Sequence, residues 1–180
     1  MYQNLPRNRF SFYLQISVLA SALISFLWVI ELFPLSKEVN FYNSTYRLTG
    51  KTFWAWNTYT FEEWGVRNEG FTMRVFKFNS GTADYFSNPD STFFRNYPRS
   101  AEGDKTIENS WTPTPVDSSD HRFIDQGFAT YTNWDEDLIN RQLKFKKLAE
   151  KEGSYYAYIR NDFYFLCPEK RLIVWINHNR

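Results

Sequence analysis

Cysteine is almost absent from this chain, in which Cys167 is the only one among 180 residues. A single thiol excludes an internal disulfide and any metal site built on cysteines of the same chain. Its place in Leu-Cys-Pro, beside an apolar segment, is typical of a buried, small hydrophobic residue. A reactive or intermolecular thiol is the alternative. Because Cys167 lies far from the N-terminus, we do not expect it to carry a lipid.

Residues and motifs that support catalysis are also scarce. The chain has two histidines, and it contains no Gly-rich phosphate loop, no G-x-S-x-G and no H-E-x-x-H. His121 follows Asp120, but adjacent side chains in an extended segment point to opposite faces, so we expect a solvated loop histidine. His178 lies near the chain end, where fraying is expected. The sequence therefore predicts no catalytic, cofactor-binding or metal site, and no enzyme.

No excess of charge of either sign is present. Once Arg7, Arg9 and Glu31 are set aside, basic and acidic residues are equal in number over the rest of the chain. Nucleic-acid binding depends on a strong positive charge, so this balance argues against it.

A long apolar run is the clearest feature of the N-terminal part. From residue 10 to residue 30 there is no charged residue, no glycine and no proline. A helix of this length measures about 31 Å, close to the thickness of the bilayer's hydrocarbon layer. We therefore predict a transmembrane helix over residues 10–32. Its anchoring side chains are Phe10, Tyr13, Leu19, Leu23, Phe26, Trp28 and Ile30.

The flanking charges predict an orientation for this helix. Arg7 and Arg9 precede the run, so the positive-inside rule places residues 1–9 in the cytoplasm and residues 35–180 outside it, in the periplasm, the extracellular space or a lumen. A cleaved signal peptide is the competing interpretation, because Ala20-Ser21-Ala22 resembles a processing site. The apolar run continues well beyond Ala22, which favours a retained anchor.

The remaining chain predicts an α+β domain over residues 35–180, with a small antiparallel sheet and one covering helix. The helix is expected at 133–153, capped by Thr132 or Asn133, with Leu143 in its apolar stripe. Residues 49–51 are expected to form a turn. Strand composition or alternation is found at 38–48, 53–64, 71–79, 154–159, 163–167 and 171–177. Residues 79–121, rich in Pro, Ser, Asn and Asp, are expected to form a long irregular loop.

Aromatic residues are abundant, at 21% of the chain, and six of them lie between residues 53 and 64. These rings could form the core, a platform for a sugar or other ring-stacking ligand, or a surface for a membrane-embedded partner. Rings in the irregular segment also need something to pack against. The candidate partner-contact residues are Trp54, Trp56, Trp64, Phe93, Phe94, Tyr97 and Trp111.

The leading hypothesis is a non-catalytic, single-pass membrane protein that serves as an accessory or assembly subunit of a larger membrane complex. Its partners would be the lipid bilayer and other membrane subunits. On this hypothesis Trp111→Ala or Phe94→Ala should weaken association without lowering stability. A membrane-tethered ligand-binding module, for example for glycans at Trp54 and Trp56, is the alternative, followed by an extracytoplasmic enzyme.

Overall fold

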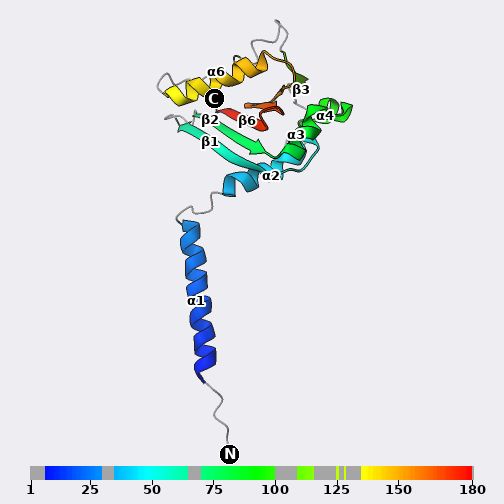
Figure 1. Ribbon diagram of the computed structural model, residues 1–180. Coiled ribbons are helices and arrows are strands. Elements are labelled where there is room, and N and C mark those ends of the chain that lie inside the picture. The colour runs from blue at the N-terminus through cyan, green and yellow to red at the C-terminus, as the bar shows by residue number, and fades with distance from the viewer. Residues whose placement is uncertain are drawn as a thin grey trace, which may run out of the picture. The chain divides into compact units, whose positions relative to one another are not determined.

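The computed structural model describes residues 7–29, 35–64, 70–99, 109–115, 125, 128 and 135–179. The chain divides into two compact units, Met1–Lys37 and Glu38–Arg180. The first unit contains helix α1 (Arg7–Val29), and the second contains a six-stranded sheet with its helices (Figure 1). The predicted α+β class is therefore confirmed for the second unit.

Helix α1 exposes apolar side chains over residues 13–26, the part of the helix whose side chains the structure describes. Those with large exposed fractions are Tyr13, Leu14, Ile16, Val18, Leu19, Leu23, Ile24 and Phe26. Within the part of the chain that the structure describes, no helix has both the length and the apolarity needed to cross a membrane. Ile30 and the side chains of Phe10 and Trp28 lie outside that part. The transmembrane assignment thus remains a prediction.

The sheet of the second unit is entirely antiparallel. Its strands are β1 (Ala55–Trp64), β2 (Gly70–Phe78), β3 (Asn109–Pro113), β4 (Tyr155–Ile159), β5 (Asp162–Cys167) and β6 (Leu172–Asn179). They lie in the order β1-β2-β6-β5-β4-β3. Three predictions are confirmed: the strand at 53–64 from its composition, the strand at 71–79 from its alternation, and the C-terminal meander.

The strand predicted at 38–48 is wrong, because this segment forms helix α2 (Leu35–Thr49). Its buried residues lie on one side of a helix: Glu38, Phe41, Thr45 and Leu48 are three or four apart, and Thr49 is four residues after Thr45. The β-branched and hydroxyl residues that suggested a strand bond back to the helix instead. Ser44 Oγ donates to the Phe41 carbonyl at 2.6 Å and Thr49 Oγ1 to the Thr45 carbonyl at 2.9 Å.

Helix α2 ends at Thr49, within the turn predicted at residues 49–51. Gly50 adopts a φ of +76°, and its N–H donates to the Tyr46 carbonyl at 2.8 Å. A Cβ at this position would lie 2.5 Å from the Tyr97 ring, so Gly50 is fixed both by its conformation and by the close approach of that ring.

The predicted irregular loop at 79–121 is also wrong over the described residues. It contains helices α3 (Ser80–Ser87) and α4 (Ser91–Asn96) as well as strand β3. The polar residues that suggested a loop are helix caps: the Asn79 side chain accepts from the Thr82 N–H at 2.8 Å, and Asp90 accepts from the Phe93 N–H at 3.1 Å. Residues 100–108 and 116–121 lie outside the described part of the chain.

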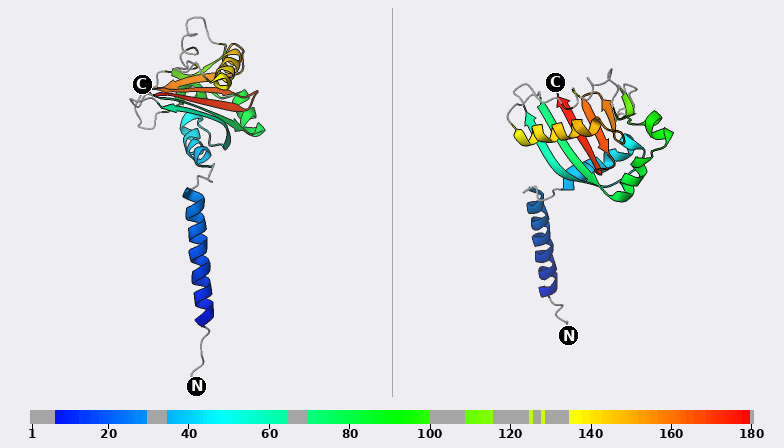
Figure 2. Two further views of the ribbon diagram at one scale, coloured as in Figure 1. Left: turned by 90° about the vertical axis from the view of Figure 1, so that its left-hand side faces the viewer. Right: turned by 45° about the horizontal axis from the view of Figure 1, so that its top comes forward.

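Helices cover both faces of the sheet, and not one face as predicted. Helix α6 (Glu136–Ala149) lies on one face, and α2 lies on the other (Figures 1 and 2). One hydrophobic cluster joins α6 to Met73, Val174 and Phe163. A second cluster joins α2, α3 and α4 to the opposite face, including Phe76 and Ile173. The central strands therefore bury both of their faces.

Helix α6 confirms the predicted C-terminal helix with two corrections. Asp135 caps it by accepting from the Leu138 N–H at 2.7 Å, while the predicted caps Thr132 and Asn133 lie outside the described residues. Leu143, predicted to lie in the apolar stripe, is 51% exposed. The buried stripe consists of Leu138, Gln142, Phe145 and Ala149.

Three contacts fix α2 across the sheet. Near its start, Glu38 Oε1 accepts from the Asn57 N–H of β1 at 3.0 Å. In the middle, the Phe41 ring stacks on Phe76 of β2 at 4.0 Å. Near its end, the Leu48 carbonyl accepts from Trp111 Nε1 of β3 at 2.6 Å. This last bond satisfies one of the carbonyls that a helix C-terminus leaves without a partner in the helix.

We expect Trp111→Ala to lower the free energy of unfolding by about 3–5 kcal/mol, because it removes a buried indole and leaves a cavity. Trp111 is 2% exposed and also stacks on Phe93 with ring centroids 5.3 Å apart. The matched control is Trp56→Ala, which removes an indole that is 51% exposed and should change stability by less than about 0.5 kcal/mol. Urea unfolding of both variants in mild detergent measures the difference, and equal losses would contradict this packing.

Candidate functional site

The structure divides the seven candidate partner-contact residues between core and surface. Phe93, Tyr97 and Trp111 are buried in the cluster under α2, α3 and α4. Phe94 is half-buried and packs against the same cluster. The expectation that these four rings form an accessible contact surface is therefore wrong for the three buried ones. They are buried because α3, α4 and β3 give them an apolar neighbourhood of the same chain.

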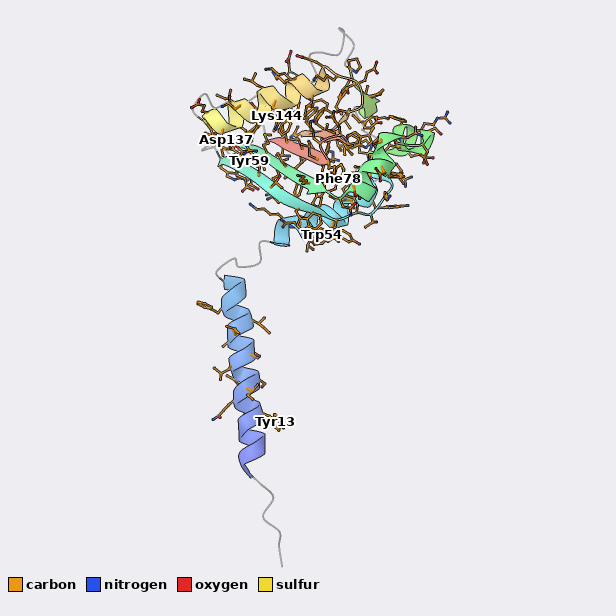
Figure 3. All side chains as sticks on the ribbon, in the orientation of Figure 1. Tyr13, Trp54, Tyr59, Phe78, Asp137 and Lys144 are labelled. Carbon is orange, nitrogen blue, oxygen red and sulfur yellow. The ribbon has the colours of Figure 1, made fainter. Side chains whose placement is uncertain are left out.

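The three remaining tryptophans stay accessible but do not form one platform. Trp54 lies just before β1, with its ring centroid 5.5 Å from that of Tyr42 on α2. Trp56 lies opposite Lys77, on the sheet face that α6 covers. Figure 3 shows residues near β1 on both sides of the sheet: Trp54 lies beside α2, and Tyr59 lies beside α6. Trp64, at the far end of β1, is 62% exposed.

An exposed aromatic surface lies on the outer side of α2. Val39, Tyr42 and Tyr46 are 42%, 37% and 54% exposed, and their spacing of three and four residues aligns them on one side of the helix. Trp54 extends this row through its contact with Tyr42. We call these four residues the α2 surface. Sequence reasoning missed it because the composition of residues 38–48 assigned them to a strand, which separates Tyr42 and Tyr46 from Val39.

A second region, in which Thr72 is buried and Arg74, Asp162, Trp175 and Asn177 are partly exposed, lies on the same side of the sheet as α2. The register places Glu62, Thr72, Asn177 and Asp162 in one row across β1, β2, β6 and β5. The preceding row contains Thr60, Arg74 and Trp175. Directly opposed residues of antiparallel strands share a face, so these side chains lie together. We call Thr60, Glu62, Trp64, Arg74, Asp162, Trp175 and Asn177 the open sheet face.

Side-chain hydrogen bonds organise the open sheet face. Arg74 donates to Glu62 Oε1 from Nη2 at 2.6 Å and from Nε at 3.2 Å. The Arg74 guanidinium lies over the Trp175 ring, 5.0 Å from its centroid. Asp162 Oδ1 accepts from Trp175 Nε1 at 2.9 Å and from Asn177 Nδ2 at 2.7 Å. The charged and aromatic groups are thus held in one connected network.

Burial shapes the electrostatics of this network. It raises the pKa of Asp162 above its usual value, because a partly desolvated carboxylate disfavours its charged form. The hydrogen bonds from Asn177 and Trp175, and the charge of His178, act in the opposite direction. Burial likewise raises the pKa of Tyr164, the next residue of β5 on this face, well above its usual range.

Among the described residues, Cys167 and His178 lie at opposite ends of neighbouring strands β5 and β6. Cys167 is buried, as predicted for a structural residue. His178 is also buried, at 6% exposed, so the prediction of a frayed end is wrong: β6 continues to Asn179, and the His178 ring packs on Phe71. His121 lies outside the described residues. Over the described part of the chain, no group of three or more His, Cys, Asp and Glu could hold a metal ion.

Comparison with known proteins adds no relative: no family model, curated protein or solved structure matches this chain. Functional inference therefore depends on the chemistry of the two accessible surfaces.

We expect Asp162→Asn to stabilise the fold in a pH-dependent way. Because folding raises the Asp162 pKa, the folded chain keeps this proton where the unfolded chain has lost it. The contribution of Asp162 to stability is complete below the unfolded pKa of about 3.9 and is lost as the pH rises through the higher folded pKa. Asparagine keeps the Oδ1 acceptor and does not titrate.

Urea unfolding of wild type and variant between acidic and neutral pH measures this effect. The stability difference in favour of Asp162→Asn should grow as the pH rises through that window and then remain constant. A difference that does not depend on pH would contradict the assignment.

Proposed function

We propose that the chain is a non-catalytic, single-pass membrane protein, an accessory or assembly subunit of a larger membrane complex. In this proposal α1 anchors the protein, the second unit lies outside the cytoplasm, and the α2 surface contacts a partner subunit.

The exposed apolar side chains of α1 carry the proposal. They do not lie on one stripe: at 100° per residue, Leu14, Leu19 and Ile24 point in widely different directions. Tyr13 and other side chains extend from the helix on different sides in Figure 3. A helix that is apolar all round needs an apolar environment on every side, which a bilayer supplies. The uncharged run of residues 10–30 supports the same assignment.

The α2 surface supports the contact with a partner. Aromatic side chains are enriched at the buried cores of protein interfaces, where tyrosine and tryptophan contribute large areas of contact. Tyr42 and Tyr46 are exposed although the same helix buries Phe41 and Leu48 on its other side. Rings exposed in this way would be covered in an assembly.

Leu19→Arg tests the anchor. An arginine near the middle of a membrane-spanning helix costs about 2.5–3.5 kcal/mol of insertion free energy, so the variant should shift from the membrane pellet to the supernatant after alkaline carbonate extraction. Leu143→Arg is the control, because Leu143 is also exposed but lies on α6. A wild-type chain that begins at Leu23 and remains in the supernatant would overturn the proposal.

The double variant Val39→Ala with Tyr42→Ala tests the partner contact. We expect it to migrate as a monomer on a native gel in mild detergent, while the wild type migrates as a larger complex and both melt at similar temperatures. Leu143→Ala is the matched control and should leave the complex intact. The same partner band should appear with a photo-crosslinking residue in place of Tyr46 and not in place of Leu143. A monomeric wild type without a crosslinked partner would contradict the contact.

A further inference from the structure

Two arginines lie at the C-terminal end of the α2 surface. The Tyr46 and Tyr97 rings meet edge to face with their centroids 6.3 Å apart, and the two side chains share a hydrogen bond. The Arg99 guanidinium lies over the Tyr97 ring, 4.8 Å from its centroid. The Arg99 N–H donates to the Arg47 carbonyl at 2.8 Å. Both arginines therefore lie at the last turn of α2, beside Tyr46.

The segment that carries the α2 surface contains positive charge and no negative charge. Residues 39–61, which include all four residues of the surface, contain Arg47 and Lys51 but no aspartate or glutamate. Glu38, the only acidic residue of α2, is buried against β1. Arg47 and Arg99 are exposed, and among the described residues no ion pair joins either of them to a carboxylate.

The contacts of the two arginines within the chain leave their positive charge unneutralised. Cations are favourable near a helix C-terminus, which accounts for their position at the end of α2. Arg99 Nε also donates to the Asn96 carbonyl at 3.2 Å. A carbonyl and an aromatic ring are neutral groups, however. A carboxylate brought to this end of the helix would therefore form charge-assisted hydrogen bonds that the chain itself does not supply.

The α2 surface and the arginines together have the composition of a protein interface. Aromatic side chains and arginine are enriched at interfaces, where the centre is apolar and the rim is polar. The planar guanidinium binds a carboxylate through two parallel hydrogen bonds, so arginine selects an acidic group with defined geometry. A partner with a lysine or arginine at this position would place like charges together, which is unfavourable.

We propose that the partner segment covering the α2 surface is an apolar stretch of polypeptide that carries an aspartate or glutamate at one end. Its apolar side chains cover Tyr42 and Trp54, and its carboxylate pairs with Arg47 and Arg99 at the last turn of α2. This inference rests on the partner contact proposed above and adds the chemistry of the partner.

Charge reversal at the two arginines tests the acidic partner. A photo-crosslinking phenylalanine analogue replaces Tyr42 in the full chain, and the crosslinked partner band is quantified in native membranes. We expect Arg47→Glu with Arg99→Glu to reduce this band at least tenfold. Arg47→Lys with Arg99→Lys should reduce it less, because lysine keeps the positive charge but loses the paired hydrogen bonds.

The matched control is Lys144→Glu with Lys147→Glu, which reverses two exposed cations on α6. Like Arg47 on α2, Lys147 lies in the last turn of its helix, so both double variants carry a similar cost to helix stability. We expect the control to leave the crosslinked band unchanged. The two double variants should melt at similar temperatures.

Salt provides a second measurement. Raising the ionic strength from 0.1 M to 1 M shortens the Debye length from about 10 Å to about 3 Å and weakens exposed ion pairs. The band from the chain with both arginines should fall at least threefold over this range. With Arg47→Gln and Arg99→Gln it should be weaker at 0.1 M and change little with salt.

Mass spectrometry of the crosslinked partner peptide separates the possible outcomes. We expect an aspartate or glutamate close to the crosslinked position, and replacing it with lysine should restore the band of the Arg47→Glu, Arg99→Glu chain. A band that is insensitive to charge reversal and salt, or a crosslinked segment without an acidic residue, would overturn the acidic partner and leave the partner contact standing. The absence of any crosslinked band would overturn both.

Discussion

The position of α2 across the sheet is the constraint on which the accessible surfaces of the second unit depend. A carboxylate at its start, a ring stack in its middle and a carbonyl near its end each contact a different strand: Glu38 reaches β1, Phe41 reaches β2 and Leu48 reaches β3. With both ends held, the helix covers the row of Phe76 and Ile173, while Glu62 and Asp162, in another row of the same face, stay at least partly exposed. The same contacts turn Tyr42 and Tyr46 to the solvent.

The abundance of aromatic residues has a structural explanation for most of its rings. A sheet covered on both faces needs apolar side chains on every central strand, and here phenylalanine and tyrosine supply much of that area. Phe86 and Phe93 are fully buried and connect short helices that have few other apolar residues. The exposed rings, among them Tyr42, Tyr46, Trp56 and Trp64, are therefore exceptions that the core does not require.

Local sequence signals predicted the elements whose evidence is local. Alternation located β2, and the two short turns located the meander of β4, β5 and β6. The segment 38–48 was assigned to a strand because valine, threonine and tyrosine favour strands. Thr45 and Thr49 are nevertheless compatible with a helix, because their hydroxyls bond to its carbonyls and one side of the helix packs on the sheet. The open sheet face could not be predicted at all. Its network joins Arg74 to Trp175 and Asp162, and only the strand order brings these residues together.

The α2 surface and the open sheet face differ in chemistry. The α2 surface consists of Val39, two tyrosines and a tryptophan, without a charged side chain among them. Removing such a surface from water is favourable, which is why the proposed partner contact is placed there. The open sheet face contains one ion pair and one further carboxylate, whose desolvation would be costly without new hydrogen bonds. The α2 surface, by contrast, can be covered without burying a charged side chain of its own.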